Sequence, residues 1–215
     1  MFESDYVKYL GILIDPHLKW NFHIDYIAPK LSRTIGMLSK LRHFVNFHTL
    51  RSIYFSIFSS IMVYGSQIWG QISNKHVDRI SKLQDKAIRI INFASYNDSR
   101  GTLYKNTKIL RFNDHIQLYN FLFIHDNFNK QHPITFNNYF TLINEKHNYV
   151  TRAAHKMHFS LPKIRTTIYG IKSISYQSIL AWNYFIGILE NRNLVNKSKS
   201  TCKKIITEHF LDSYD

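Results

Sequence analysis

Long stretches of this 215-residue chain repeat apolar residues at steps of three and four, and this feature constrains the fold most. Such spacing places side chains on one face of an α-helix. The first stretch predicts a helix over residues 23–42, with Trp20, Ile24, Ile27, Leu31, Ile35, Leu38 and Leu41 on its apolar face. Only seven Gly and four Pro residues are present to interrupt helices. The sequence therefore predicts a mainly α protein, a helical bundle followed by a smaller irregular and helical C-terminal region.

The other expected elements follow from the same patterns. Residues 6–15 are apolar on both sides and end at Asp15-Pro16, which predicts a short β-strand in a covered sheet ahead of the bundle. Pro29 should either lie in the first turn of its helix or kink it. Further helices are expected near residues 49–64, 74–92, 113–127, 175–189 and 200–211, with loop and a short helix at residues 96–110 and irregular structure at residues 131–171.

Residues 52–74 contain no Asp, Glu, Lys or Arg, and the run is long enough to span a bilayer. Ser, Gln and Gly dilute its hydrophobicity, however, so we favour a buried helix over a membrane span. This helix is apolar nearly all round, with Asn46 or Thr49 as its N-cap, and we expect it at the centre of the bundle. Gly65 could end it.

The charge of the chain limits its partners. Lys and Arg number 28 against 14 Asp and Glu, which gives a net charge of +14. This excess indicates a polyanionic partner, either nucleic acid or an acidic membrane surface. Cys202 is the only cysteine, which excludes an internal disulfide and a cysteine-based zinc site. The segment of residues 1–5 is short and acidic and offers no basic n-region, so we expect no signal peptide. We therefore expect an intracellular location, nuclear or cytoplasmic.

The helix expected at residues 74–92 carries the best candidate binding site. Its apolar side holds Val77, Ile80, Leu83, Gln84, Ala87 and Ile91. The opposite side, within roughly 80°, holds the basic residues Lys75, Arg79, Lys82, Lys86 and Arg89. We interpret them as contacts to nucleic-acid phosphates. The alternative is a solvated helix face with ion pairs such as Asp78–Lys82 and Asp85–Arg89.

Aromatic residues could stack on bases, and Tyr64, Trp69, Tyr96 and Trp182 are the candidates by residue type. Tyr64 and Trp182 fall on apolar helix faces, so the core is the better prediction for both. His155 and His158 have a spacing that metal ligands use, but no third ligand is evident nearby. We therefore expect no metal site.

Short motifs, in a fixed order, cover nearly the whole chain. They are Lys8-Tyr9-Leu10-Gly11, Asp15, Leu18-Lys19-Trp20, His23-Ile24, Leu31-Ser32-Arg33, Ile35-Gly36-Met37-Leu38, Leu41-Arg42, Tyr64-Gly65, Ile68-Trp69-Gly70, Leu83-Gln84-Asp85-Lys86-Ala87-Ile88-Arg89, His147-Asn148-Tyr149-Val150-Thr151-Arg152, Arg165-Thr166, Gly170, Ser175-Tyr176 and Trp182-Asn183. This ordered set resembles the C-terminal part of the reverse transcriptases of jockey-like non-LTR retrotransposons, from the end of the palm through the thumb.

The resemblance implies a division into residues 1–16 as the end of the palm, residues 17–130 as a helical thumb-like domain and residues 131–215 as a C-terminal region. It implies an RNA/DNA template–primer duplex as partner, together with a palm and fingers that this sequence lacks, and no membrane. Tyr9, Leu10 and Gly11 would lie at or near the primer grip. We expect such a fragment of an RNA-directed DNA polymerase to help bind the template–primer.

Catalysis by this chain alone is not expected. Polymerases use converging carboxylates to hold two metal ions, and this sequence has no adjacent acidic pair. No catalytic residue and no cofactor are therefore assigned, and Mg²⁺ would belong to the parent polymerase. The alternative function is a helical protein-interaction module that docks through residues 53–63, or a degenerate element relic with no activity of its own.

Overall fold

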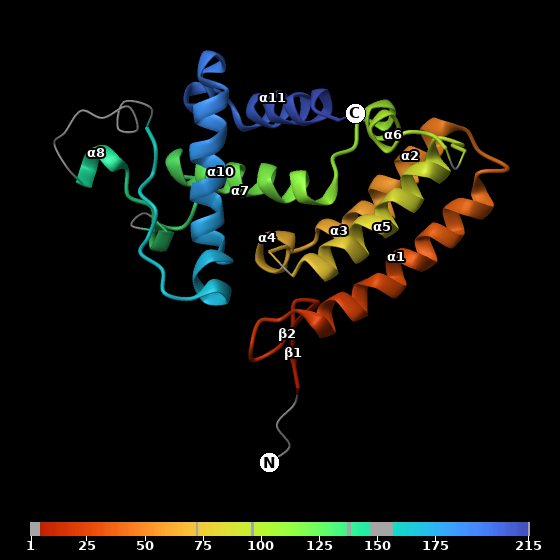
Figure 1. The fold of residues 1–215 in the computed structure, drawn as a ribbon, viewed down its shortest axis with the longest axis horizontal. Helices are drawn as coiled ribbons and strands as arrows, with labels where there is room; N and C mark the ends of the chain where they lie inside the picture. Colours follow the sequence, from red (N-terminus) through yellow and green to blue (C-terminus); the bar gives the residue numbers. More distant parts are fainter. Residues whose placement is uncertain (1–4, 72, 96, 137–138, 147–156, 215) are drawn as a thin grey trace. The chain divides into compact units, whose positions relative to one another are not determined.

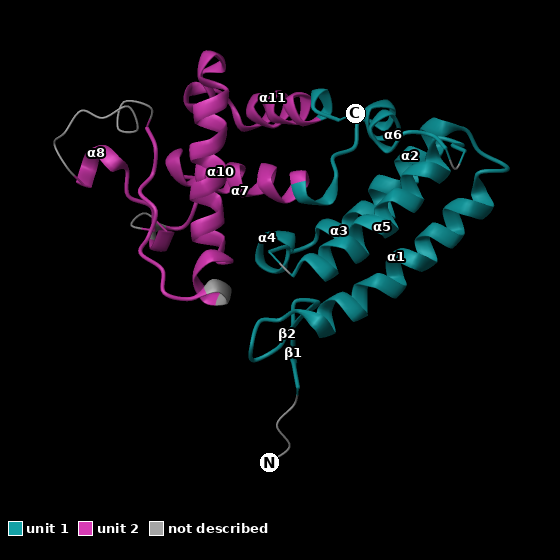
Figure 2. Cartoon of the chain, in the orientation of Figure 1, with its two compact units in different colours: residues 1–113, 211–215 teal, residues 114–210 magenta. Residues whose placement is uncertain are grey.

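A computed structural model describes residues 5–71, 73–95, 97–136, 139–146 and 157–214 (Figure 1). The chain forms two compact units, unit 1 with residues 1–113 and 211–215, and unit 2 with residues 114–210 (Figure 2). Both units are built mostly from helices, and the described residues contain one two-stranded sheet near the N-terminus. The expected mainly α fold with short β structure ahead of the helices is confirmed.

The expected single strand is a hairpin. Strands β1 (Val7–Tyr9) and β2 (Ile12–Ile14) pair antiparallel, with Tyr9 opposite Ile12. The two turn residues, Leu10 and Gly11, have φ angles of 45° and 83°. Positive φ at both central positions matches the twist of paired strands, but Asn or Asp usually occupies the first. The prediction of one strand in a covered sheet was wrong, because Leu at position 10 gives no sequence signal for a turn.

Replacing Leu10 with Asn should stabilise the hairpin by about 1 kcal/mol, because Leu pays a steric cost at positive φ that Asn largely avoids. Leu10 is 70% exposed, so the substitution removes little packing. The measurement is the urea dependence of unfolding. Leu161→Asn is the control, because Leu161 is also exposed but is not among the residues with positive φ. An equal or larger gain in the control would contradict this account of Leu10.

Asp15 organises the loop between the hairpin and the first helix. Its carboxylate accepts hydrogen bonds from the backbone N–H groups of His17 (3.1 Å), Lys19 (3.0 Å) and Trp20 (2.7 Å). Burial acts to raise the pKa of this carboxyl, but the backbone donors outweigh it and hold the pKa below its usual value. The loop thus places Trp20 in the core, directly before helix α1 (Asn21–Leu41).

Helix α1 runs through Pro29 without ending there. It begins at Asn21, so the alternative in which the helix starts near Pro29 was wrong. Its buried side chains confirm the predicted apolar face: Ile24, Ile27, Leu31 and Leu38 are all at most 4% exposed.

The next helix comprises α2 (Phe47–Ile53), a π-helical segment η1 (Tyr54–Ser59) and α3 (Ser60–Val63). Asn46 is its N-cap, and its side chain accepts from the Thr49 backbone N–H at 3.0 Å. The chain turns at Gly65, whose φ is 64°, so the predicted stop is confirmed. The short helix α4 (Ser66–Trp69) follows.

The prediction that this helix lies at the centre of the bundle was wrong. Its buried residues form one column at steps of four, Leu50, Tyr54, Phe58 and Met62. Phe55 and Ile57 are exposed. Three serine hydroxyls on the outer side donate to carbonyls one turn earlier, Ser52 to His48, Ser56 to Ser52 and Ser60 to Ser56. The run can therefore face solvent without charges, because its polar groups bond locally.

Helix α5 (Asn74–Ile91) packs beside α1, and α6 (Arg100–Thr107) follows it (Figure 1). The fully buried Gln84 joins three parts of unit 1. Its Nε2 donates to the Tyr54 hydroxyl (3.0 Å) and the Leu110 carbonyl (2.8 Å). Its Oε1 accepts from the Phe112 backbone N–H (2.9 Å). This amide satisfies buried backbone groups that no helix or sheet could satisfy.

Unit 2 contains most of α7 (Phe112–Phe128), then η2 (Ile134–Phe136), α8 (Ile143–Lys146), η3 (Thr167–Ile171), α10 (Ile174–Ile188), η4 (Glu190–Arg192), η5 (Leu194–Asn196) and most of α11 (Lys199–Asp212). The long helices α7, α10 and α11 confirm the expected ones. Trp182 lies in the core, as predicted, and stacks on Phe121 with ring centroids 5.0 Å apart. The neighbouring Asn183 bonds to both backbone groups of Phe159 at 2.9 Å.

Candidate nucleic-acid interface

The five basic residues predicted on α5 do not share one environment. Lys75, Lys82 and Lys86 are exposed on the outer side of the helix. Within the described parts of the chain, no carboxylate pairs with any of these three ammonium groups. Arg79 is also exposed, but it forms an ion pair with Asp25 of α1. Three lysines of α5 therefore remain available to an anionic ligand.

Arg89 is hydrogen-bonded to the loop that follows α5. Its guanidinium donates to the carbonyl oxygens of Ser95 (2.7 Å) and Asp98 (3.2 Å). The expected pairing of Asp85 with Arg89 was wrong, because Asp85 instead accepts from the Tyr104 hydroxyl (2.9 Å) and pairs with Arg100 (3.2 Å). Arg89 thus fixes the chain that leaves α5, and residue spacing alone gives no sign of this role.

The basic side of α5 continues onto α1. The two helices run in the same direction, since Asn21 contacts His76 (2.6 Å), Asp25 contacts Arg79, and Arg42 lies over Phe93 (5.5 Å).

Arg33 and Lys40 are exposed on α1, within about 80° of Asp25 around the helix axis. We call Arg33, Lys40, Lys75, Arg79, Lys82 and Lys86 the basic surface. Sequence reasoning missed the α1 contribution because it treated each helix separately.

The hairpin residues Tyr9, Leu10 and Gly11 form an exposed tip that contacts a distant segment. The Tyr64 hydroxyl donates to the Leu10 carbonyl at 2.7 Å, across 54 residues of sequence. Tyr64 is 54% exposed, so its expected place in the core was wrong. Gly65 favours this arrangement because its φ of 64° is one that residues with a Cβ rarely adopt, and a Cβ there would press against the Cδ1 end of the Ile12 side chain. Two motifs of the ordered set, Tyr9-Leu10-Gly11 and Tyr64-Gly65, therefore meet in space.

Trp69 is fully buried and cannot stack on a base from this position. Its indole Nε1–H donates to the Tyr64 carbonyl (2.7 Å), and its ring stacks on Phe112 (5.6 Å). Trp69 thus supports the peptide that carries Tyr64. Two other predicted features, Tyr96 and the motif of residues 147–152, lie outside the described residues.

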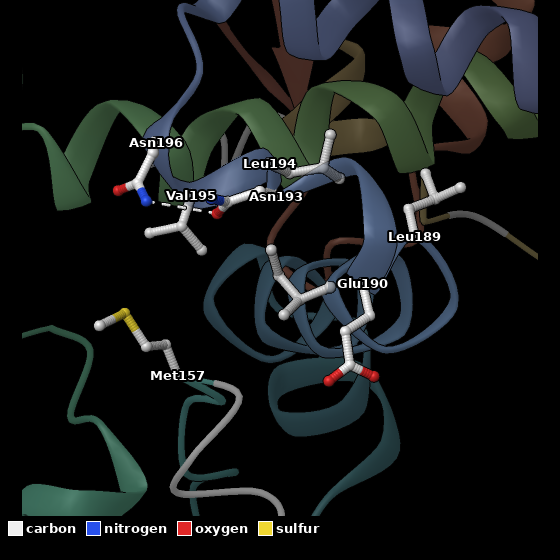
Figure 3. A pocket seen from close by; sticks show the side chains of 8 residues that line it. Met157, Leu189, Glu190, Asn193, Leu194, Val195 and Asn196 are labelled. Atoms are coloured by element: carbon white, nitrogen blue, oxygen red, sulfur yellow. Dashed lines mark hydrogen bonds between the residues drawn. The ribbon is translucent and has the colours of Figure 1, made fainter.

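Unit 2 offers a shallow apolar hollow of about 230 Å³ (Figure 3). It is lined by Met157, Ile186, Leu189, Glu190, Asn193, Leu194, Val195 and Asn196. The Asn196 amide donates to the Asn193 side chain at 3.3 Å across one edge. None of these lining residues is Lys or Arg, so the hollow is a poor candidate for binding a phosphate.

His155 of the candidate pair is outside the described residues. Among the His, Cys, Asp and Glu residues that the structure describes, no three gather in a way that could hold a metal ion. None of the helices in the described ranges is both long enough and apolar enough to cross a membrane.

Comparison with known proteins gives three curated relatives, all from Drosophila melanogaster. The probable RNA-directed DNA polymerases from transposon X-element and from transposon BS are each 30% identical, over 112 and 105 residues. The RNA-directed DNA polymerase from mobile element jockey is 28% identical over 113 residues. These alignments cover 51%, 47% and 51% of this chain.

Each alignment spans only 12% of the relative's own length. The chain matches no protein-family model, and no solved structure matches it. The relatives nevertheless agree with the family indicated by the ordered motifs. Over about half of its length, this chain resembles the RNA-directed DNA polymerases of jockey-like non-LTR retrotransposons.

Proposed function

We propose that unit 1 binds the sugar–phosphate backbone of an RNA/DNA template–primer duplex through the basic surface, as the thumb of a reverse transcriptase would. The observation that carries this proposal is the row of exposed lysines on α5, which no carboxylate in the described part of the chain pairs with, continued by Arg33 and Lys40 on α1. Lysine ammonium groups neutralise phosphates without reading bases, so the binding should tolerate any sequence.

The length of the lysine row fits this role. From Lys75 to Lys86 the α5 axis rises about 16 Å. One strand of a duplex advances about 3.4 Å per phosphate, so about five phosphates lie along that distance. Three ammonium groups can therefore each reach a different phosphate of the same strand. The similarity to polymerases supports this assignment, since those proteins must hold a duplex while they copy a template.

Removing three charges tests the proposal. In Lys75→Gln/Lys82→Gln/Lys86→Gln, affinity for an RNA/DNA hybrid should fall about tenfold or more near 0.1 M salt, and the slope of log K against log salt should flatten by about 2 to 3. Fluorescence anisotropy across a salt series measures both quantities. The matched control is Lys105→Gln/Lys108→Gln/Lys204→Gln, which removes three exposed lysines elsewhere. Equal losses in both variants, or binding that salt does not affect, would contradict the proposal.

The proposal assigns duplex binding to this chain and no nucleotide transfer. Purified chain should not extend a primer in the presence of Mg²⁺ and deoxynucleotides. Incorporation that EDTA abolishes, and that persists through a further purification step, would require a different function.

A second candidate function is protein docking through the outer side of α2, η1 and α3. Phe55 and Ile57 favour it, because they expose apolar side chains on the two flanks of the buried column, in a segment, residues 52–60, that carries no charge. The Arg51 guanidinium lies over the Phe55 ring (4.9 Å) at one end of this surface. We propose the palm of the same polymerase as the docked partner. Phe55→Ser/Ile57→Ser should then weaken association with a separately expressed palm from a jockey-like relative and leave duplex affinity unchanged. Undiminished association would exclude this surface.

A further inference from the structure

Two lysines from different elements converge on one tyrosine ring in unit 1. The Lys30 Nζ of α1 lies 3.6 Å from the centroid of the Tyr26 ring, and the Lys8 Nζ of β1 lies 5.7 Å from it. Lys8 is exposed, and Tyr26 and Lys30 are half-buried. No carboxylate of the described residues pairs with either ammonium, and the adjacent Asp25 is already paired with Arg79.

This arrangement brings two like charges to one ring, and no carboxylate of the described residues is paired with them. Ammonium groups that share one ring repel each other, and an exposed cation–π contact contributes only about 0.5 to 1 kcal/mol. The pKa of the Tyr26 hydroxyl is lowered, first by a hydrogen bond and the charge of Lys30 and then by the charge of Lys8. The same positive potential that stabilises a phenolate would stabilise a bound anion.

We propose that Lys8, Tyr26 and Lys30 form an oxyanion site that takes one phosphate group. The two ammonium groups supply the charge and several N–H donors, and the Tyr26 hydroxyl supplies one more donor. The site rests on the proposed duplex binding, where its ligand would be a backbone phosphodiester. The same chemistry would accept a free phosphate or a nucleotide.

The position of the site gives it a specific role in that binding. Lys8 precedes the hairpin tip, Tyr9-Leu10-Gly11, while Tyr26 and Lys30 lie on the helix that carries Arg33 and Lys40 of the basic surface. A phosphate held between β1 and α1 would therefore link the hairpin to the basic surface. One nucleic-acid strand could then contact both, with the tip placed beside it.

The experiment compares Lys8→Gln/Lys30→Gln with Lys105→Gln/Lys108→Gln, which removes the same charge from another part of unit 1. Circular dichroism checks that both variants keep the fold. Hybrid-duplex affinity should fall about threefold to tenfold in the first variant only, with the salt slope flatter by about 1 to 2. Tyr26→Phe should give a smaller loss. Equal losses in the Lys8/Lys30 and control variants would overturn the site.

A second measurement identifies the source of the phosphate. Inorganic phosphate is titrated while NMR follows the Tyr26 ring signals of the wild-type chain and of Lys8→Gln/Lys30→Gln. Saturable shifts that only the wild type shows, together with the loss of duplex affinity, support a backbone phosphodiester. The same shifts with unchanged duplex affinity overturn the duplex contact and assign the site to free phosphate.

The two proposals can fail separately. If Lys75→Gln/Lys82→Gln/Lys86→Gln weakens duplex binding and Lys8→Gln/Lys30→Gln changes neither binding nor the phosphate titration, the oxyanion site is wrong and the proposed function stands. If neither variant weakens duplex binding and phosphate leaves the Tyr26 signals unchanged, both are wrong.

Discussion

Replacing Gln84 with Leu is expected to lower the free energy of unfolding of unit 1 by about 3 kcal/mol. Leu fills similar space but leaves the Phe112 N–H and the Leu110 carbonyl buried without their partner. Each unsatisfied buried group costs about 1 to 3 kcal/mol. The effect should be large because Leu110 and Phe112 are at most 8% exposed, so water cannot easily replace the lost bonds.

Hydrogen exchange of the α5 amides measures this loss locally, and urea denaturation followed by circular dichroism measures it globally. Gln117→Leu makes the same substitution at an exposed position of α7 and should cost little. A Tyr54→Phe/Gln84→Leu double-mutant cycle separates the Tyr54 bond from the two backbone bonds. Equal stabilities of Gln84→Leu and Gln117→Leu would show that the buried amide contributes nothing.

Acidification from pH 7 to pH 4 is expected to destabilise unit 1 by about 3 kcal/mol through His23 alone. Burial, and then the nearby Lys30 charge, lower the pKa of His23 from 6.5 to about 4. The unfolded chain therefore binds the proton more readily than the folded chain between these values. The stability that neutral His23 contributes is complete above about pH 6.5 and is lost as the pH falls through about 4.

His23→Asn tests this source of acid sensitivity. Neutral His23 accepts from the Leu13 N–H through Nδ1 (3.4 Å), and an Asn side-chain oxygen can accept that bond without titrating. The loss of stability between pH 7 and pH 4, read from α1 hydrogen exchange, should shrink by most of the 3 kcal/mol. His48→Asn removes an exposed imidazole and serves as the control. An unchanged pH profile in His23→Asn would assign the acid sensitivity elsewhere.

Unit 2 should keep an acid response of its own. Burial, and then the charge of Lys203, lower the pKa of His115 to about 4. Asp15 affects stability in a lower pH range, since its pKa in the folded chain is below the usual 3.8. Its contribution to the free energy of unfolding is lost only as the pH falls through this lowered pKa. The His23 substitution should therefore change unit 1 between pH 6.5 and pH 4 and leave these other responses in place.

The helices could be predicted from the sequence because their apolar spacing is local. The spacing in residues 23–42 and 74–92 identified α1 and α5, and Gly65 marked a true stop. Burial was harder to predict. Residues 52–60 carry no charge yet face solvent on one side, because the hydroxyls of Ser52, Ser56 and Ser60 bond to carbonyls of their own helix.

The hairpin and its contacts could not be predicted because they depend on distant partners. Leu10 occupies a turn position that Asn or Gly usually takes, and Tyr64 reaches it across 54 residues. The candidate interface likewise contains local features that could be predicted and distant contacts that could not. Helical spacing alone placed Lys75, Lys82 and Lys86 on an exposed side. The partners of Arg89 are backbone carbonyls, which residue type does not encode.

The π-helical segment η1 has a consequence for how homologous sequences should be aligned. In an α-helix, a step of four residues overshoots a full turn by about 40°, so the three steps from Leu50 to Met62 would wind by about 120°. A π-helical turn holds more residues than an α-helical turn, so η1 offsets part of this winding along the buried column. Deleting one residue from this segment would restore α-helical winding and swing Tyr64 away from the Leu10 carbonyl. A one-residue gap in this segment between homologues therefore indicates that the hydrogen bond from Tyr64 to the hairpin is changed, even where every flanking residue is identical.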